Sequence, residues 1–311
     1  MDKIIYPEMR RQINKDNIVI RIKADDWLYV LDDMNTVRMF LVIGNEKALL
    51  IDAGFGFVDF RPLIKEVTDL PVTVVCTHGH DDHILGCRFF DEAYLGEEDL
   101  PLCTSNDNPA QKEKQIAAMR KKTPDVDTIV DKENYLYNTT LKNCNFKFAK
   151  DGDIFDLGGI TLEVIPIPGH TLGSIALYCK EKKAIFVGDT MGKNHMLHYG
   201  QALEISAEPQ YFIRGLSRIS KLDVETVWPA HGDLPAGPEL ITDTRDMFVS
   251  WTKNYDIARD MKITPLDSVF GTPGGAGYQY EYPEKNMKMS YHLGHLEQIL
   301  KYMKTHDGAI E

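Results

Sequence analysis

The sequence predicts a layered α/β protein in which strands and helices share one core. A strand, a helix and a second strand follow one another in the first eighty residues, which is typical of layered α/β folds. The order of strands and then helices recurs after residue 154. In addition, 43% of the 311 residues are hydrophobic, which is enough to build a sizeable core.

The elements of the first half follow from residue type and period. Runs rich in Val, Ile and Leu predict strands at 17–23, 37–43, 47–53 and 71–76. The turn at 44–46 separates the second run from the third, so we expect those two to form a hairpin. Residues 60–70 place four aliphatic side chains at helical spacing, which predicts a helix between the third and fourth strands.

The second half begins with a charged segment and then returns to strands. Residues 88–150 are charged and moderately helical, and we interpret them as a helical insertion over one end of the core. Strands are expected at 154–169, at 174–180 and 183–189 as a second hairpin, and at 224–233. Helices are expected at 207–223, 238–261 and 291–304, with a loop rich in Gly, Pro and Tyr at 271–286.

No change in composition marks a linker between domains. We therefore expect one domain over 1–311, with a core at 17–240, the insertion at 88–150 and a helical C-terminal extension at 240–311.

Charge and cysteine content narrow the class of protein. The net charge of −12 argues against a general affinity for nucleic acid or for an anionic membrane. Five widely spaced cysteines without a C-x-x-C motif suggest reduced thiols in a cytosolic protein. The N-terminal residues lack the apolar stretch of a signal peptide, and no apolar run approaches the ~18 residues of a membrane span. We expect a cytoplasmic protein that acts on a small molecule. A homodimer is possible from the sequence and is neither predicted nor excluded by it.

Polar residues suited to binding metal follow several of the apolar, strand-like runs. The densest group is THGHDDH at 77–83, and the full set is Asp52, His78, His80, Asp82, His83, His170, Asp189 and His231. Neutral imidazole suits zinc and other transition metals, and a carboxylate can bridge two ions. Eight such residues exceed the needs of one tetrahedral ion. They suit two ions ~3.5–4 Å apart, which clamp a hydroxide between them.

The order of these residues resembles the signature of the metallo-β-lactamase superfamily. H-x-H-x-D-H occurs at 78–83, followed by His170 in PGHTLGS, Asp189 in VGD and His231 in PAHG. The resemblance implies a four-layer αββα sandwich with the site at one edge between two sheets. It also implies hydrolysis, and the nearest branches are the glyoxalase-II-like and lactonase-like enzymes.

The resemblance also implies a role for each residue of the set. His78, His80 and His170 would bind the first metal, Asp82, His83 and His231 the second, and Asp189 both. Asp82 would also act as a general acid or base. Asp52 would support the metal-binding loop without coordinating a metal.

Some neighbouring residues remain open. Lys193, His195 and His198 follow Asp189 closely and could reach a substrate, but an exposed loop or helix face explains them equally well. Asp81 is expected to be solvated or to make a hydrogen bond within its loop.

These observations predict a hydrolase with two divalent metal ions per chain, with zinc favoured and iron or manganese open. The expected bond is an ester, a lactone or a thioester, and a phosphodiester is the alternative. An iron-dependent oxidoreductase similar to the persulfide dioxygenases is a second alternative, and a non-catalytic binding module is a third. Neither the insertion nor the tyrosines of 278–282 identify a substrate.

Overall fold

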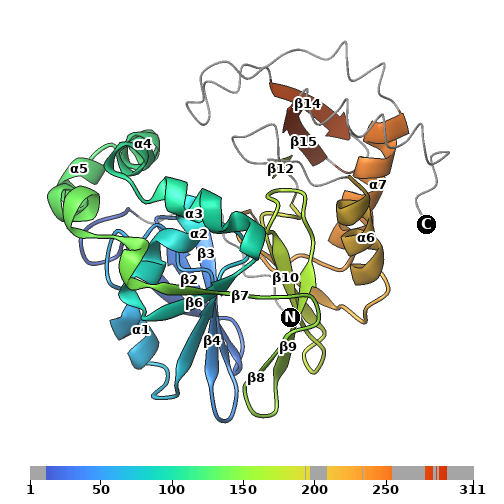
Figure 1. Cartoon of the computed structure of the whole chain (residues 1–311), viewed down its shortest axis with the longest axis horizontal. Coiled ribbons are helices and arrows are strands. Elements are labelled where there is room, and N and C mark those ends of the chain that lie inside the picture. The colour runs from blue at the N-terminus through green and yellow to red at the C-terminus, as the bar shows by residue number, and fades with distance from the viewer. Residues whose placement is uncertain are drawn as a thin grey trace.

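The computed structural model describes residues 12–192, 194–196, 209–232, 234–253, 277–282, 285 and 287–292. Two large sheets pack face to face, with helices on both outer sides (Figure 1). The layers are therefore helices, sheet, sheet and helices, and the predicted four-layer αββα sandwich is confirmed.

The first sheet has seven strands in the order β1-β2-β3-β4-β5-β6-β7. They are β1 (Val19–Lys23), β2 (Leu28–Asp33), β3 (Val37–Ile43), β4 (Ala48–Ile51), β5 (Val72–Val75), β6 (Glu92–Leu95) and β7 (Asn145–Phe148). The expected hairpin is confirmed, since β3 and β4 pair antiparallel with Phe40 opposite Ile51. Strand β2 was not predicted, because its sequence LYVLDD ends in two aspartates and lacks a regular alternation.

The second sheet has five strands in the order β13-β11-β10-β9-β8. They are β8 (Ile154–Asp156), β9 (Thr161–Pro166), β10 (Ile175–Cys179), β11 (Ala184–Gly188) and β13 (Thr226–Pro229). The second expected hairpin is confirmed by the antiparallel pairing of β10 with β11.

Apolar side chains on opposite faces of the strands separate the layers. In β3, Phe40 and Val42 lie in the core between the two sheets, whereas Met39 and Leu41 face the first helical layer. A strand buried on both faces needs apolar residues at successive positions, which explains the run VRMFLVI.

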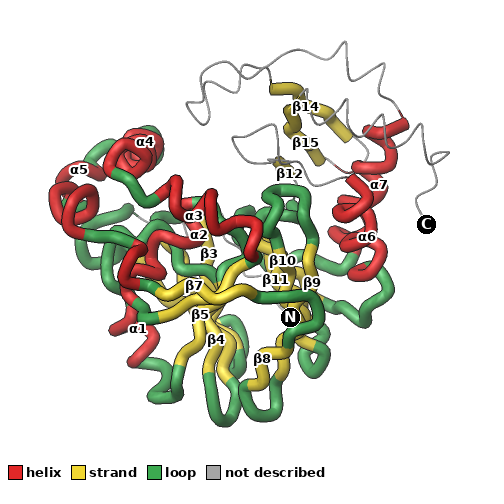
Figure 2. Tube along the Cα trace, in the orientation of Figure 1, coloured by secondary structure: helices red, strands yellow, loops and turns green. Residues whose placement is uncertain are grey.

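The helical layers are visible in Figure 2. The first contains α1 (Arg61–Lys65), α2 (Asp81–Ile84), α3 (Leu100–Asn106), α4 (Pro109–Met119) and α5 (Val126–Ile129), and the second contains α6 (Pro209–Ile219) and α7 (Glu239–Lys253). Helix α1 ends at Lys65, earlier than the expected 60–70, and a turn follows in which Val67 N and Thr68 N donate to the Ile64 carbonyl. The expected extension of α7 to residue 261 lies outside the described residues.

The expected helical insertion at 88–150 is too long. Its ends supply β6 and β7, which pair in parallel within the first sheet, and the helical part lies between them. Four-residue strands such as EAYL and NFKF are too short to be recognised from their pattern, and the neighbouring strands decide their conformation.

The C-terminal extension is not wholly helical. A small sheet joins β12 (Asn194–Met196), β15 (Met287–His292) and β14 (Gly277–Tyr282), so the tyrosine-rich segment 278–282 is a strand and not a loop. GYQYEY alternates with period two, a strand signal that its flanking Gly and Pro residues obscured. Residues 291 and 292 of the expected final helix belong to β15, and the rest of that helix lies outside the described residues.

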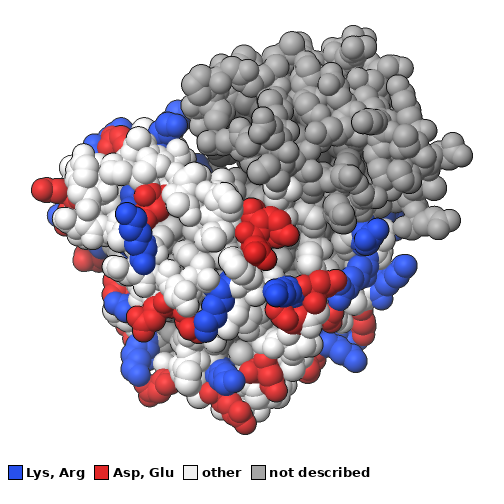
Figure 3. Space-filling model, viewed as in Figure 1, with Lys and Arg blue, Asp and Glu red and all other residues white. Residues whose placement is uncertain are grey.

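Charged side chains of both signs lie interspersed on the described face of the molecule in Figure 3. Among the helices that the structure describes, none combines the length and the apolar character needed to cross a bilayer. The five cysteines are buried and form no disulfide.

Candidate metal centre

The ligand-type residues come together where strands of the two sheets end. His78 and His80 follow β5, and Asp82 and His83 lie in α2, which begins directly after them. The remaining three come from the second sheet, in the turns that follow β9, β11 and β13, and they are His170, Asp189 and His231. Segments far apart in the sequence thus converge at one edge of the sandwich.

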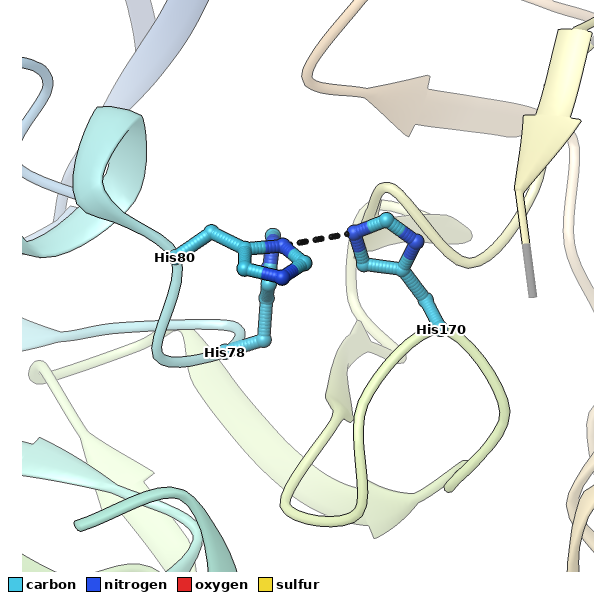
Figure 4. A group of neighbouring side chains, drawn as sticks. All are labelled: His78, His80 and His170. Carbon is cyan, nitrogen blue, oxygen red and sulfur yellow. Dashed lines mark hydrogen bonds between the residues drawn. The ribbon is translucent and has the colours of Figure 1, made fainter. Parts of the chain in front are cut away.

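Three imidazoles form the first group (Figure 4). His78 Nε2 lies 3.0 Å from His80 Nδ1, which lies 2.9 Å from His170 Nε2. Burial lowers the pKa of His78 well below its usual range, so this imidazole is neutral and offers a lone pair at neutral pH. Three converging ring nitrogens form a tripod suited to one transition-metal ion.

The second group contains Asp82, His83 and His231. Asp82 Oδ1 lies 3.5 Å from His83 Nε2, and Asp82 Oδ2 lies 3.3 Å from His231 Nε2. The backbone carbonyl of Thr36 lies 2.7 Å from His231 Nδ1, which must donate to it. In the neutral imidazole this bond leaves the lone pair of His231 on Nε2, where it faces the group.

Asp189 lies between the two groups. Its Oδ1 is 3.4 Å from His83 Nε2, and its Oδ2 is 3.5 Å from His170 Nε2 and 3.3 Å from His231 Nε2. One carboxylate therefore reaches imidazoles of both groups, which is the position a bridging ligand needs.

Two buried atoms show that these residues suit metal ions. His83 Nε2 and Asp189 Oδ1 are buried and lie 3.4 Å apart, and neither makes a hydrogen bond among the described residues. Leaving such atoms unsatisfied is costly, and both are atoms that coordinate divalent cations. The mixture of imidazole nitrogen and carboxylate oxygen suits zinc, iron or manganese.

The electrostatics of the second group favour positive charge. Burial alone would lower the pKa of His231, but the Asp189 and Asp82 carboxylates raise it to about 10. Burial would raise the pKa of Asp82, but His83 and His231 lower it to about 2. The carboxylates thus attract a cation, whether it is a proton or a metal ion.

Asp52 supports the centre through hydrogen bonds to residues of the metal-binding motif. Its carboxylate accepts hydrogen bonds from Thr77 N at 2.7 Å and from His83 Nδ1 at 2.9 Å, and it is completely buried. The left-handed backbone of Asp52, with φ of 63°, turns the chain after β4 so that the side chain reaches both residues. The bond to His83 directs the other ring nitrogen toward Asp189.

Replacing Asp52 with Asn is expected to weaken zinc binding about 10–100-fold, because His83 loses the anionic partner that orients its ring and raises its basicity. A competition titration with a zinc chelator measures this change. Asp153→Asn is the control, since that carboxylate accepts from Lys150 N on the surface, and it should leave zinc affinity unchanged. Wild-type affinity in Asp52→Asn would contradict the expectation.

Asp81 lies beside the ligand groups in the sequence but belongs to none of them. Asp81 is buried, so the expectation that it is solvated is wrong, whereas the alternative of a hydrogen bond within its loop is confirmed, since Asp81 Oδ1 accepts from Asp82 N at 3.1 Å. Its Oδ2 also accepts from Gln111 and Gln115 of α4. His195 lies in β12 opposite Met289 of β15. Lys193 and His198 lie outside the described residues.

Three supporting residues were missed by the sequence analysis. The Thr77 hydroxyl donates to Asp52, and the Thr36 carbonyl orients His231. Asp99 contacts the loop of His78 and His80 and the loop of His170. Thr77 adjoins the motif and could have been suspected, but no local signal marks Thr36 or Asp99.

Comparisons with known proteins agree with this geometry. The family model of the metallo-beta-lactamase superfamily matches residues 34–95 and 107–231. Acyl-coenzyme A thioesterase MBLAC2 from Homo sapiens is 25% identical over 211 residues, which cover 63% of this chain and 73% of the relative. A hydroxyacylglutathione hydrolase from Hyphomonas neptunium is 42% identical over 78 residues, 25% of this chain and 28% of the relative.

A solved structure supports the fold. A metallo-beta-lactamase family protein from Thermus thermophilus has a TM-score of 0.56 at 17% identity, with 93% of each chain covered. The resemblance stated from the motifs is thus confirmed by a family model that spans more than half of the chain. The chain belongs to the metallo-β-lactamase superfamily.

Proposed function

We propose that the protein is a hydrolase that uses two divalent metal ions, with zinc favoured, to cleave an ester-type bond of a small molecule. The observation that carries the proposal is the position of Asp189, whose two carboxylate oxygens reach imidazoles of both ligand groups. A site for one ion would not need a carboxylate shared in this way.

The ligand groups supply a role for each residue. His78, His80 and His170 would hold one ion, Asp82, His83 and His231 the other, and Asp189 both. When bound, such a pair lowers the pKa of water and polarises the carbonyl oxygen of the substrate. Thr36 and Asp52 keep His231 and His83 oriented. The low pKa of Asp82 keeps this carboxylate ionised at neutral pH, as a metal ligand must be, and Asp82 is also the proposed general acid or base.

Among ester, lactone and thioester substrates, we favour a thioester. The support is that one relative is named an acyl-coenzyme A thioesterase and that another is named a hydroxyacylglutathione hydrolase.

The test combines metal analysis with a substrate screen. Protein purified without added metal should contain about two zinc, manganese or iron ions per chain. It should hydrolyse acyl thioesters faster than matched oxygen esters, lactones and phosphodiesters. A single iron with oxygen uptake would instead indicate the oxidoreductase alternative. Absence of bound metal after reconstitution would contradict the proposal.

Metal binding is expected to release about two protons near pH 7 and to strengthen as the pH rises. Burial would lower the pKa of His83 and His231, but the carboxylates raise that of His83 well above its usual range and that of His231 to about 10. Both imidazoles are therefore protonated at neutral pH before metal binds, and the metal must displace these protons. The part of the pH dependence that comes from His231 should fade above about 10.

Isothermal titration calorimetry with zinc in two buffers of different ionisation enthalpy counts the protons released. Identical heats in both buffers would contradict the expectation. His78 should add nothing to the number of protons released, since its lowered pKa leaves this imidazole neutral before metal binds.

A further inference from the structure

We propose that Asp99 is a positioning residue that holds the two loops of the first ligand group at the separation needed for metal binding. It ends the short helix Glu97–Asp99, and its side chain is 1% exposed. Nothing in its local sequence, GEEDLP, marks it as different from the acidic residues beside it. The inference rests on the proposed metal centre and assigns a task to the helical segment between β6 and β7.

The Asp99 carboxylate joins the two loops directly. Its Oδ2 accepts hydrogen bonds from Gly79 N at 2.7 Å and from Thr171 Oγ1 at 2.6 Å, and its Oδ1 accepts from Gly173 N at 2.7 Å. Gly79 lies between the ligands His78 and His80, and Thr171 directly follows the ligand His170. Each loop is therefore bound within one residue of a ligand.

Close packing reinforces these bonds. A Cβ atom added at Gly79 would lie 2.9 Å from the Asp99 carbonyl oxygen, and one at Gly173 would lie 2.7 Å from Asp99 Cγ. Both loops thus approach Asp99 more closely than a residue with a side chain would allow. Asn106 Nδ2 in addition donates to the Gly79 carbonyl at 3.0 Å, so both backbone polar groups of Gly79 are bonded to the segment 97–106.

These contacts involve no metal ion. The three imidazoles of the group come from two chain segments, one with His78 and His80 and one with His170. Without Asp99, the ion itself would have to bring these segments together. Buried hydrogen bonds to a carboxylate are stronger than those between neutral groups, so Asp99 can hold the loops before the ion arrives. Preorganisation of this kind raises affinity because less ordering remains to be done on binding.

The experiment is a zinc titration of metal-free protein against a competing chelator. Wild type should show two binding steps. Asp99→Asn keeps the size of the side chain but removes its charge and one acceptor, and it should weaken one step about 10–100-fold while changing the other little.

The matched control is Asp107→Asn. Asp107 belongs to the same helical segment between β6 and β7, its side chain is 7% exposed, and it contacts Lys112, Thr140 and Leu141 but none of the ligand loops. This variant should keep both binding steps.

Ligand variants identify which step depends on Asp99. In a His80→Ala background, which lacks the first site, Asp99→Asn should cause no further loss. In a His231→Ala background it should still weaken the remaining step. A merely structural role would affect both backgrounds alike. If Asp99→Asn does not fold, Thr171→Val, which removes a single donor, should weaken the same step to a smaller extent.

Two unchanged binding steps in Asp99→Asn, or equal weakening of both, would overturn the inference and leave the proposed function standing. Conversely, if wild type binds two ions but hydrolyses none of the esters tested, the proposed activity fails and the role of Asp99 can still be measured. Failure of wild type to bind any metal would overturn both.

Discussion

Replacing Asp189 with Asn is expected to lower kcat/KM for hydrolysis about 10³-fold or more, which corresponds to a loss of about 4 kcal/mol of transition-state stabilisation. The carboxylate reaches His83, His170 and His231 at 3.3–3.5 Å, between the two ligand groups. An amide of the same shape has no charge and a single acceptor oxygen, so it cannot serve two ions equally. Steady-state kinetics together with metal analysis measure the change, and the metal content should fall as well.

The matched control for this variant is Asp81→Asn. Asp81 is also a buried aspartate near the centre, but it is bonded to Gln111 and Gln115 and belongs to none of the ligand groups. Its replacement should reduce kcat/KM by less than about tenfold, since Asn keeps a side-chain oxygen that can accept the hydrogen bond from Asp82 N. Near wild-type turnover in Asp189→Asn would contradict the bridging role.

Complete removal of metal is expected to lower the melting temperature by about 10 °C or more. An ion present at about a thousand times its dissociation constant stabilises the folded state by about 4 kcal/mol, so two ions contribute about 8 kcal/mol. Each kcal/mol corresponds to about 1.5 °C in a chain of 311 residues. The stabilisation is expected because the ligands come from the ends of strands in both sheets and from α2, and an unfolded chain cannot bring them together.

Thermal unfolding followed by circular dichroism, before and after treatment with a chelator, measures this shift, and elemental analysis verifies removal. Asp189→Asn is the control, because a variant that holds less metal should lose less stability on chelation. An unchanged melting temperature in verified metal-free wild type would show that metal binding at the strand ends does not stabilise the folded state.

The sequence by itself determined the features that depend on residue type and short-range pattern. The apolar runs predicted both hairpins, since alternation and turn residues act over a few neighbouring positions. The spacing of His78, His80, Asp82 and His83 identified the family, together with the order of the three later residues of the signature, which are His170, Asp189 and His231.

The tertiary structure decided what depends on contacts between distant segments. Strands β6 and β7 have four residues each, too few for a pattern to identify them, so their neighbours in the sheet set their conformation. The burial of Asp81 has no local signal, because the two glutamines that cover it come from α4. Asp99 has the local sequence of a surface residue, and only packing places its carboxylate between Gly79 and Thr171. Residue type can indicate which atoms could bind a metal, but the hydrogen bonds that orient those atoms form only when the chain has folded.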